Sequence, residues 1–423
     1  MPDPISITAA DLTSEGTGDP AAEDRFHRFK LISWWDQHRL ANAKVLVIGA
    51  GALGNELIKN LALLGVGNVL VADLDSIENS NLSRSVLYRA TDNGQPKAAV
   101  AARAAREIYP GMKTQAFVGN VVYDLGLGVF RWADVILGGL DNREARLAIN
   151  RACWRLNKPW VDGAIEQIQG TARVFAPDGP AQQAPCYECT MSETDWRLLN
   201  LRRSCNLLTR EQMQTGHTPT TPTISSIIAG VQVQEAVKLL HGLESFAGKG
   251  WVFAGLSADS YMTEFQRKED CYSHDPLDEV IELPHSAATL TAAELLRIAR
   301  ERLGPDAQIE LGRDVLEKLT CPRCGQSETL FSSLGKVSAD KAWCPTCAGE
   351  GHQARREVVT FHKIRGDEPF LDRPLAAIGV PPFDILVSRN FERVIGFELT
   401  GDAPEVLGDL HRAADDDNGL AFE

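Results

Sequence analysis

Seven cysteines and one histidine in this 423-residue chain form four pairs with the spacing of metal ligands. Each pair is separated by two residues, and a turn of that length places two ligand atoms on the same side of one ion. Only Cys153 and Cys205 remain for other chemistry. The four pairs are Cys186 with Cys189, Cys271 with His274, Cys321 with Cys324, and Cys344 with Cys347.

The last two pairs lie nineteen residues apart, which is typical of a zinc ribbon at 321–347. A redox role for these thiols is the less favoured alternative. Nine cysteines that mostly have metal-ligand spacing also suit a reducing compartment, so we expect a cytoplasmic protein without disulfides.

A second chemical feature is the glycine-rich stretch Gly49-Ala-Gly51-Ala-Leu-Gly54, directly after the apolar run Val45–Ile48. Glycines at this spacing let backbone N–H groups approach phosphates at the start of a helix. A carboxylate that could bind a ribose, Asp73, ends the next expected strand. The motif alone favours NAD, and a glycine turn without a ligand is the plainer alternative.

Four polar motifs then change the balance towards a nucleoside triphosphate. They supply cations and carboxylates that Mg²⁺ and a triphosphate require and nicotinamide does not. All four follow expected strands, at the edge where open α/β sheets bind ligands. The motifs are Asp73-Leu-Asp75, Asn81-Leu-Ser-Arg84, Gly94-Gln-Pro-Lys97 and Asp141-Asn142.

Alternating apolar runs and helical patterns must position these residues, and they predict a doubly wound, mostly parallel sheet of the Rossmann type. The expected strands are 44–48, 68–72, 114–118, 134–137 and 159–161. The expected helices are 24–43, 54–64, 97–108, 142–156 and 222–241. We therefore divide the chain into a disordered start (1–23), a nucleotide domain (24–275) and a C-terminal domain (276–423).

The C-terminal domain has its own pattern of strand (280–283), helix (292–303) and strand (308–311), followed by strands near 358–361, 384–387 and 394–399. This order predicts an α+β domain that carries the ribbon and is compatible with a β-grasp. A net charge of −14 without a basic stripe argues against nucleic-acid binding. No apolar run is long enough to cross a bilayer.

From about Arg25 to His274 the chain resembles the superfamily of ubiquitin-activating enzymes and bacterial sulfur-carrier adenylyltransferases. The resemblance rests on G-A-G-A-L-G, D-L-D, N-L-S-R, G-Q-P-K and D-N in this order, with Ser85 as a departure where many relatives carry glutamine. It implies that the protein binds ATP and Mg²⁺ and adenylates the C-terminal glycine of a ubiquitin-fold protein. The implied ligands are Asp73 for the ribose, Asn81, Arg84 and Lys97 for the phosphates, and Asp141 for Mg²⁺, with Gly49, Gly51, Gly54, Asp75 and Asn142 completing the site.

The resemblance also assigns roles outside the nucleotide site. Arg25-Phe-His-Arg28 is similar to a family motif whose second arginine enters the neighbouring subunit's site, which implies a homodimer. Cys186, Cys189, Cys271 and His274 would close one structural zinc. Cys153 is expected in the core, whereas Cys205 lies in an extended crossover stretch, about 190–221, where activating enzymes carry a thioester cysteine. Arg202 and Arg203 would favour its thiolate, and an incidental surface cysteine is the alternative.

These features lead to a first hypothesis and three alternatives. The first is an activating enzyme that transfers a ubiquitin-like protein from its adenylate to Cys205 and then to a conjugating enzyme recruited by the C-terminal domain. The second is sulfur-carrier activation for molybdopterin or thiamine synthesis, without a thioester. A non-catalytic scaffold and an NAD dehydrogenase are the remaining alternatives, which the set Arg28, Arg84, Lys97 and Asp141 disfavours.

Overall fold

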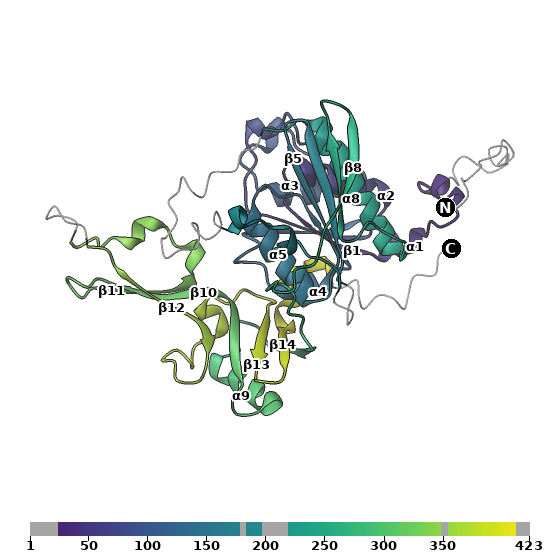
Figure 1. Cartoon of the computed structure of the whole chain (residues 1–423). Coiled ribbons are helices and arrows are strands. Elements are labelled where there is room, and N and C mark those ends of the chain that lie inside the picture. The colour runs from purple at the N-terminus through teal and green to yellow at the C-terminus, as the bar shows by residue number, and fades with distance from the viewer. Residues whose placement is uncertain (1–23, 178–182, 197–218, 348–353, 412–423) are drawn as a thin grey trace, which may run out of the picture.

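The computed structural model describes residues 24–177, 183–196, 219–347 and 354–411, which form two β-sheets with helices (Figure 1). The first sheet has eight strands in the order β3-β2-β1-β4-β5-β6-β7-β8. Its first five strands in the chain are parallel, and β6, β7 and β8 continue it antiparallel. The strands are β1 (Lys44–Ile48), β2 (Asn68–Asp73), β3 (Lys113–Val118), β4 (Val135–Gly138), β5 (Trp160–Glu166), β6 (Gln169–Phe175), β7 (Lys249–Ala254) and β8 (Asp259–Glu264).

Side chains alternate across this sheet, so its parallel strands contribute to two separate cores. Val45 and Val47 of β1 pack in the core formed with α2 (Ala52–Leu64), α3 (Lys97–Ile108) and α8 (Pro222–His241). Leu46 and Ile48 point the other way, towards α4 (Leu127–Trp132) and α5 (Arg143–Arg155). Because both faces are covered, the central strands β1, β2 and β4 are almost continuously apolar rather than alternating.

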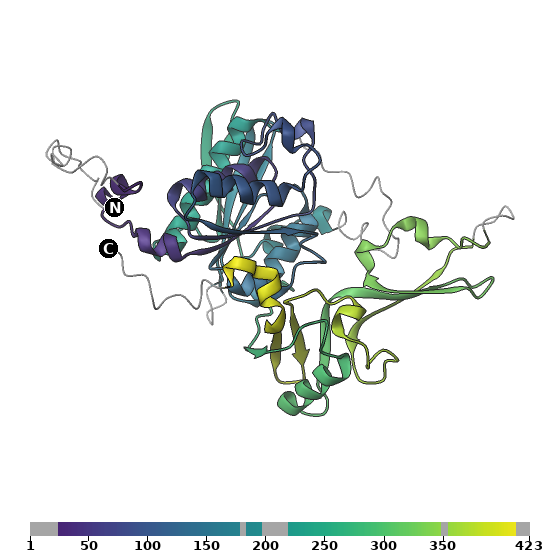
Figure 2. The same ribbon diagram turned by 180° about the vertical axis from the view of Figure 1, so that it is seen from behind.

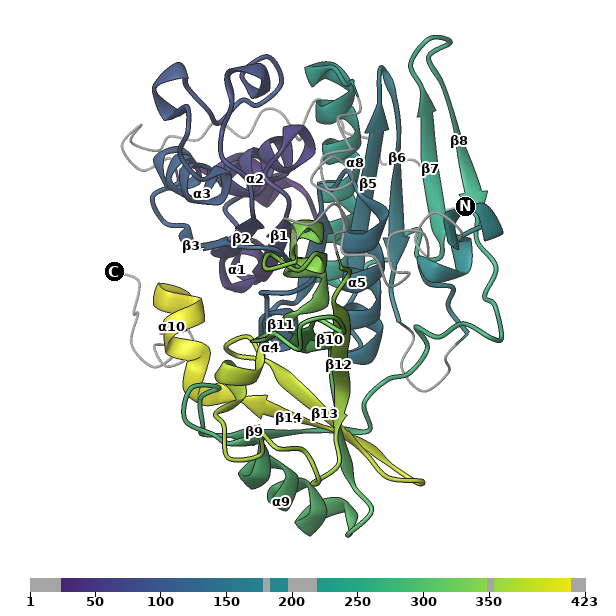
Figure 3. The same ribbon diagram turned by 90° about the vertical axis from the view of Figure 1, so that its left-hand side faces the viewer.

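The second sheet follows the order β11-β10-β13-β14-β9, with β12 also paired to β10. Its first and last strands in the chain, β9 and β14, are parallel, and the other pairs are antiparallel. Helix α9 (Ala292–Leu303) packs on one face, on the side away from the first sheet (Figure 3). The strands are β9 (Glu279–Leu283), β10 (Gln308–Thr320), β11 (Ser327–Ser333), β12 (Glu357–Ile364), β13 (Ile385–Arg389) and β14 (Val394–Leu399).

The two sheets are joined by a shared apolar core and by buried polar contacts. Helix α10 (Ala403–Leu407) follows the last strand and packs beneath the first sheet, in the same core as α4 and α5 (Figure 2). The Asp384 carboxylate accepts a hydrogen bond from the Leu127 N–H (2.9 Å) and forms an ion pair with Arg313 (2.9 Å). The C-terminal elements therefore help to complete the core of the nucleotide domain.

Most of the expected elements are confirmed with shifts of one or two residues at their ends. The expected helix 24–43 is wrong: a short 3-10 helix (His27–Leu31) is followed by a turn and then by α1 (Gln37–Asn42). Asp36 accepts hydrogen bonds from the N–H groups of His38 and Arg39 and thereby starts α1 as a new helix. Sequence patterns also missed β6, β7, β8 and β11. Among the described residues, no helix combines the length and apolar character needed to cross a bilayer.

Candidate nucleotide site and zinc centres

The glycine loop lies between β1 and α2, and two of its glycines are required by close backbone contacts. Gly49 has a φ of +92°, and a Cβ there would lie 2.4 Å from the Gly139 carbonyl oxygen. A Cβ at Gly54 would lie 1.8 Å from the Gly49 carbonyl oxygen. A Cβ at Gly51 would meet no described atom within 4 Å apart from its own chain neighbours and local helix backbone. The loop is thus packed against the end of β4 on one side and open at Gly51, where a phosphate could approach the start of α2.

Two buried side chains that the sequence reasoning missed hold this loop in place. The Asn55 amide donates to the Ala50 (2.7 Å) and Gly51 (3.0 Å) carbonyls and accepts from the Leu87 N–H (2.9 Å). The Tyr88 hydroxyl also donates to the Ala50 carbonyl (2.6 Å), and burial raises the Tyr88 pKa far above its usual value. Asn55 follows the last loop glycine directly, and a polar asparagine at the start of an otherwise largely apolar helix was the available signal.

Asp73 occupies the predicted position at the end of β2 and faces the glycine loop. Its carboxylate accepts hydrogen bonds from the N–H groups of Ala50 (2.7 Å) and Asp75 (2.7 Å). Burial raises the Asp73 pKa, against the opposing effect of these bonds and of Lys97. Lys97 starts α3 and forms an ion pair with Asp75 (2.8 Å). The structure therefore brings Asp73, Asp75 and Lys97 together beside the loop.

The N-L-S-R segment has well-defined local contacts. Asn81 Oδ1 accepts from the Glu78 N–H (3.0 Å) and closes a 3-10 turn, so this atom has a structural partner. The half-buried Arg84 donates to the Ser80 carbonyl (2.8 Å). A few residues later the chain returns to the loop, where Leu87 binds Asn55. Among the described residues, these hydrogen bonds of Asn81 and Arg84 are local ones, and the phosphate roles of both side chains stay predictions.

Asp141 and Asn142 follow β4 and differ in their accessibility. Asn142 Oδ1 accepts from the Ala145 N–H (2.8 Å) and caps α5, so it is committed to the helix. The Asp141 carboxylate is exposed and, within the described part of the chain, forms no ion pair. Carboxylate oxygens at the open edge of a sheet suit Mg²⁺. Asp141 lies where a magnesium ligand could be presented, with Asn142 fixing the start of the helix behind it, and its magnesium role stays a prediction.

Arg28 lies at the opposite edge of the sheet from the glycine loop. The adjacent Phe26 ring packs against Gly65, at the end of α2, and the Arg25 guanidinium donates to the Ile108 carbonyl (2.6 Å), at the end of α3. Both helix ends precede the amino ends of strands, whereas the loop and Asp141 follow carboxyl ends. Within one chain Arg28 is therefore remote from the nucleotide site.

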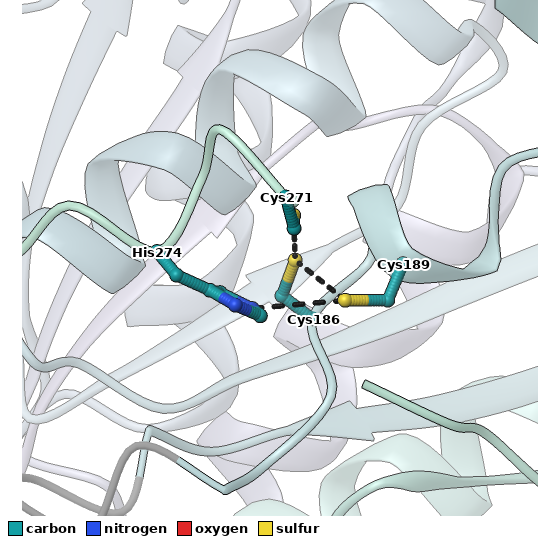
Figure 4. A group of neighbouring side chains, drawn as sticks. All are labelled: Cys186, Cys189, Cys271 and His274. Atoms are coloured by element: carbon teal, nitrogen blue, oxygen red, sulfur yellow. Dashed lines mark hydrogen bonds between the residues drawn. The ribbon is translucent and has the colours of Figure 1, made fainter. Parts of the chain in front are cut away.

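Cys186, Cys189, Cys271 and His274 converge into one cluster (Figure 4). Cys186 Sγ lies 3.7 Å from Cys189 Sγ and 3.5 Å from Cys271 Sγ, and His274 Nε2 lies 3.7 Å from Cys189 Sγ. A tetrahedral zinc with Zn–S bonds of 2.3 Å separates its sulfurs by about 3.8 Å. The His274 ring packs beside Trp154 with Nε2 facing the thiols. This donor set fits a closed structural zinc.

The second cluster, Cys321, Cys324, Cys344 and Cys347, stands at the far end of β10 and β11. Cys321 Sγ lies 4.0 Å from Cys347 Sγ, and Cys324 Sγ lies 3.6 Å from Cys344 Sγ. These distances again match tetrahedral zinc, so the four cysteines have the arrangement predicted for a zinc ribbon. Figure 1 shows β10 and β11 reaching away from the body of the first sheet.

The two remaining cysteines have different outcomes. Cys153 is fully buried beside Ile149, and burial raises its pKa well above the usual value, so the predicted core role is confirmed. Cys205 and most of the expected crossover loop lie outside the described residues. The predicted thioester role of Cys205 therefore stays a prediction.

A doubly wound sheet with a glycine loop, a carboxylate bonded to that loop and a cluster of zinc-type ligands has the architecture expected of the activating-enzyme class. Residues 24–273 match the ThiF family, and the chain belongs to this family. This confirms the resemblance drawn from the motifs.

Relatives of both expected kinds match part of the chain. A sulfur carrier protein adenylyltransferase of Thermus thermophilus is 37% identical over 170 residues, which are 39% of this chain and 63% of that protein. The SUMO-activating enzyme subunit uba-2 of Caenorhabditis elegans is 36% identical over 162 residues, 38% of this chain and 27% of the relative. The chain thus spans less than two thirds of the length of these relatives. The ATP complex of Escherichia coli MccB is similar in fold, with a TM-score of 0.50 at 20% identity over 63% of this chain and 77% of MccB.

Proposed function

We propose that the protein uses ATP to adenylate the C-terminal carboxylate of a ubiquitin-like protein. The observation that carries this proposal is the arrangement at the carboxyl edge of the sheet. There Asp73 is locked to the glycine loop, Lys97 pairs with Asp75, and the Asp141 carboxylate is exposed. Membership of the ThiF family supports the same chemistry.

In the proposed reaction the substrate carboxylate attacks the α-phosphorus of ATP and the bond to the bridging oxygen breaks. The acyl adenylate forms and pyrophosphate leaves with the negative charge. No general base is needed because the attacking carboxylate is ionised at neutral pH. Lys97 and Arg84 would stabilise the charge that develops on the phosphates, and N–H groups near Gly51 would orient them. Mg²⁺, held by Asp141, would supply further charge stabilisation when bound.

A second subunit completes this site in our proposal. Arg28 lies across the sheet from the nucleotide loop of its own chain, so it is too far away to serve that chain's own site and is exposed for contact with a neighbouring copy. We therefore propose a homodimer in which Arg28 of each subunit enters the other subunit's site.

After adenylation, we propose transfer of the acyl group to Cys205. The thiolate attacks the acyl carbon, a thioester forms, and AMP leaves with the bonding electrons. A conjugating enzyme recruited by the C-terminal domain would then accept the ubiquitin-like protein. The alternative function is sulfur-carrier activation, which shares the adenylation step and lacks this thioester. The similarity to the Thermus sulfur carrier protein adenylyltransferase supports this alternative.

Two assays test the steps in order. The first is ATP–pyrophosphate exchange with Mg²⁺ and a ubiquitin-like protein that ends in glycine and is encoded beside this gene. Exchange is expected, and binding of nicotinamide without exchange would overturn adenylation. The second is a non-reducing gel of the same mixture. A thiol-sensitive adduct that disappears in Cys205→Ala supports the activating enzyme, whereas exchange without an adduct supports the sulfur-carrier alternative.

A further inference from the structure

The short loop from Gly138 to Asp141 is held at each of its first three residues. Gln232 Nε2 of α8 donates to the Gly138 carbonyl (2.9 Å). The Gly139 N–H donates to the Ile48 carbonyl (2.8 Å), next to the glycine loop. The Leu140 carbonyl accepts from Arg146 (2.5 Å). Only Asp141, at the end of this loop, is exposed.

Arg146 reaches the loop from the first turn of α5 and is itself buried. Its guanidinium donates from Nε to Asp162 Oδ1 (2.9 Å) and from one terminal nitrogen to the Leu140 (2.5 Å) and Gly163 (2.9 Å) carbonyls. A planar guanidinium can make several such bonds at fixed angles, which a single ammonium group cannot reproduce. These three bonds therefore fix the Leu140 carbonyl relative to β5.

Asp162, which is fully buried on β5, anchors this guanidinium through one oxygen. Its other oxygen accepts from Nε of Arg173 on β6 (2.9 Å). Arg173 also lies over the Tyr187 ring, and none of its described contacts involves the 138–141 loop. The two arginines thus bind the same carboxylate, but only Arg146 also touches the loop that carries Asp141.

We propose that Arg146 is a positioning residue that fixes the Leu140 carbonyl and thereby aims the Asp141 carboxylate at Mg²⁺ of the bound nucleotide. Arg146 touches neither substrate nor ion. It acts by restricting Asp141 to few conformations before the ion binds, so that less conformational entropy is lost on binding. Residues behind a metal ligand commonly act in this way. This inference rests on the proposed function, because it takes Asp141 to be the magnesium ligand.

The matched pair Arg146→Lys and Arg173→Lys separates positioning from general stability. Both variants keep a positive charge beside Asp162 and both lose guanidinium bonds, so both should lower the melting temperature. Binding of ATP is then measured by calorimetry over a series of MgCl₂ concentrations, with no protein substrate present. Arg146→Lys should raise the Mg²⁺ concentration needed for half-maximal binding about tenfold, and Arg173→Lys should leave it unchanged.

Equal Mg²⁺ requirements in the two variants, or a wild-type requirement in Arg146→Lys, would overturn the positioning role. If Arg146→Lys does not fold, the double variant Arg146→Gln with Asp162→Asn removes both charges together, and the same tenfold increase is expected of it. The proposed function fails separately: wild-type protein that binds ATP with Mg²⁺ but exchanges no pyrophosphate refutes adenylation while leaving the Mg²⁺ comparison intact.

Discussion

Replacing Asn55 by alanine should both destabilise the nucleotide domain and weaken ATP binding. Asn55 is completely buried and makes three hydrogen bonds, to Ala50, Gly51 and the N–H of Leu87. Alanine removes all three and leaves the Leu87 N–H buried without its side-chain partner. The two loop carbonyls lose the amide that fixes them beneath the phosphate position.

The size of the effect follows from these bonds. At about 1 kcal/mol of net stability for each hydrogen bond, Asn55→Ala should lower the free energy of unfolding by about 3 kcal/mol. For a domain of this size each kcal/mol lowers the melting temperature by roughly 2–4 °C, so a fall of roughly 6–12 °C is expected. A loop that must be ordered again on binding should cost about tenfold in ATP affinity, equivalent to about 1.4 kcal/mol.

Thermal unfolding and calorimetric ATP binding measure the two effects, and Asn68→Ala is the control. Asn68 is also a buried asparagine that donates to backbone carbonyls, those of Asn42 (3.4 Å) and Ala43 (3.3 Å), but it lies at the start of β2. Asn68→Ala should lower stability and leave ATP affinity unchanged. The reasoning fails if Asn55→Ala binds ATP like the wild type, or if both variants lose affinity equally.

Three further predictions concern the proposed site and the metals. Asp141→Ala should reduce pyrophosphate exchange to background, and retained exchange would contradict its magnesium role. Mixing Arg28→Ala with Asp141→Ala subunits should restore part of the activity, because one of the two sites in the mixed dimer then keeps both residues. A verified mixed dimer without activity would argue against an arginine that enters the partner subunit's site. Metal analysis should find two zinc ions per wild-type chain and one in Cys344→Ser, since the cluster with His274 is separate; two ions in Cys344→Ser would exclude the ribbon site.

Local patterns in the sequence were sufficient wherever a feature depends on neighbouring residues. The glycine loop, the strands at 44–48 and 68–72, and the C-x-x-C turns each follow from spacing within a few residues. Apolar runs bounded by turns identify buried strands, and two thiols two residues apart identify half of a metal site. The position of Asp73 and Asp141 after strands was equally predictable, because parallel strands end at one edge.

Tertiary structure alone decided how distant segments meet. The geometry of the first zinc cluster depends on Cys186 and His274 being brought together across the whole length of α8, and Arg146 binds an aspartate on a strand that follows its own helix. Strands β6 to β8 show only weak alternation of apolar and polar residues, so their sequence did not identify them as strands. Pairing with neighbouring strands holds them in the sheet. The C-terminal helix α10 completes a core begun near residue 46. Such contacts depend on the packing of complementary surfaces, which periodicity along the chain does not specify.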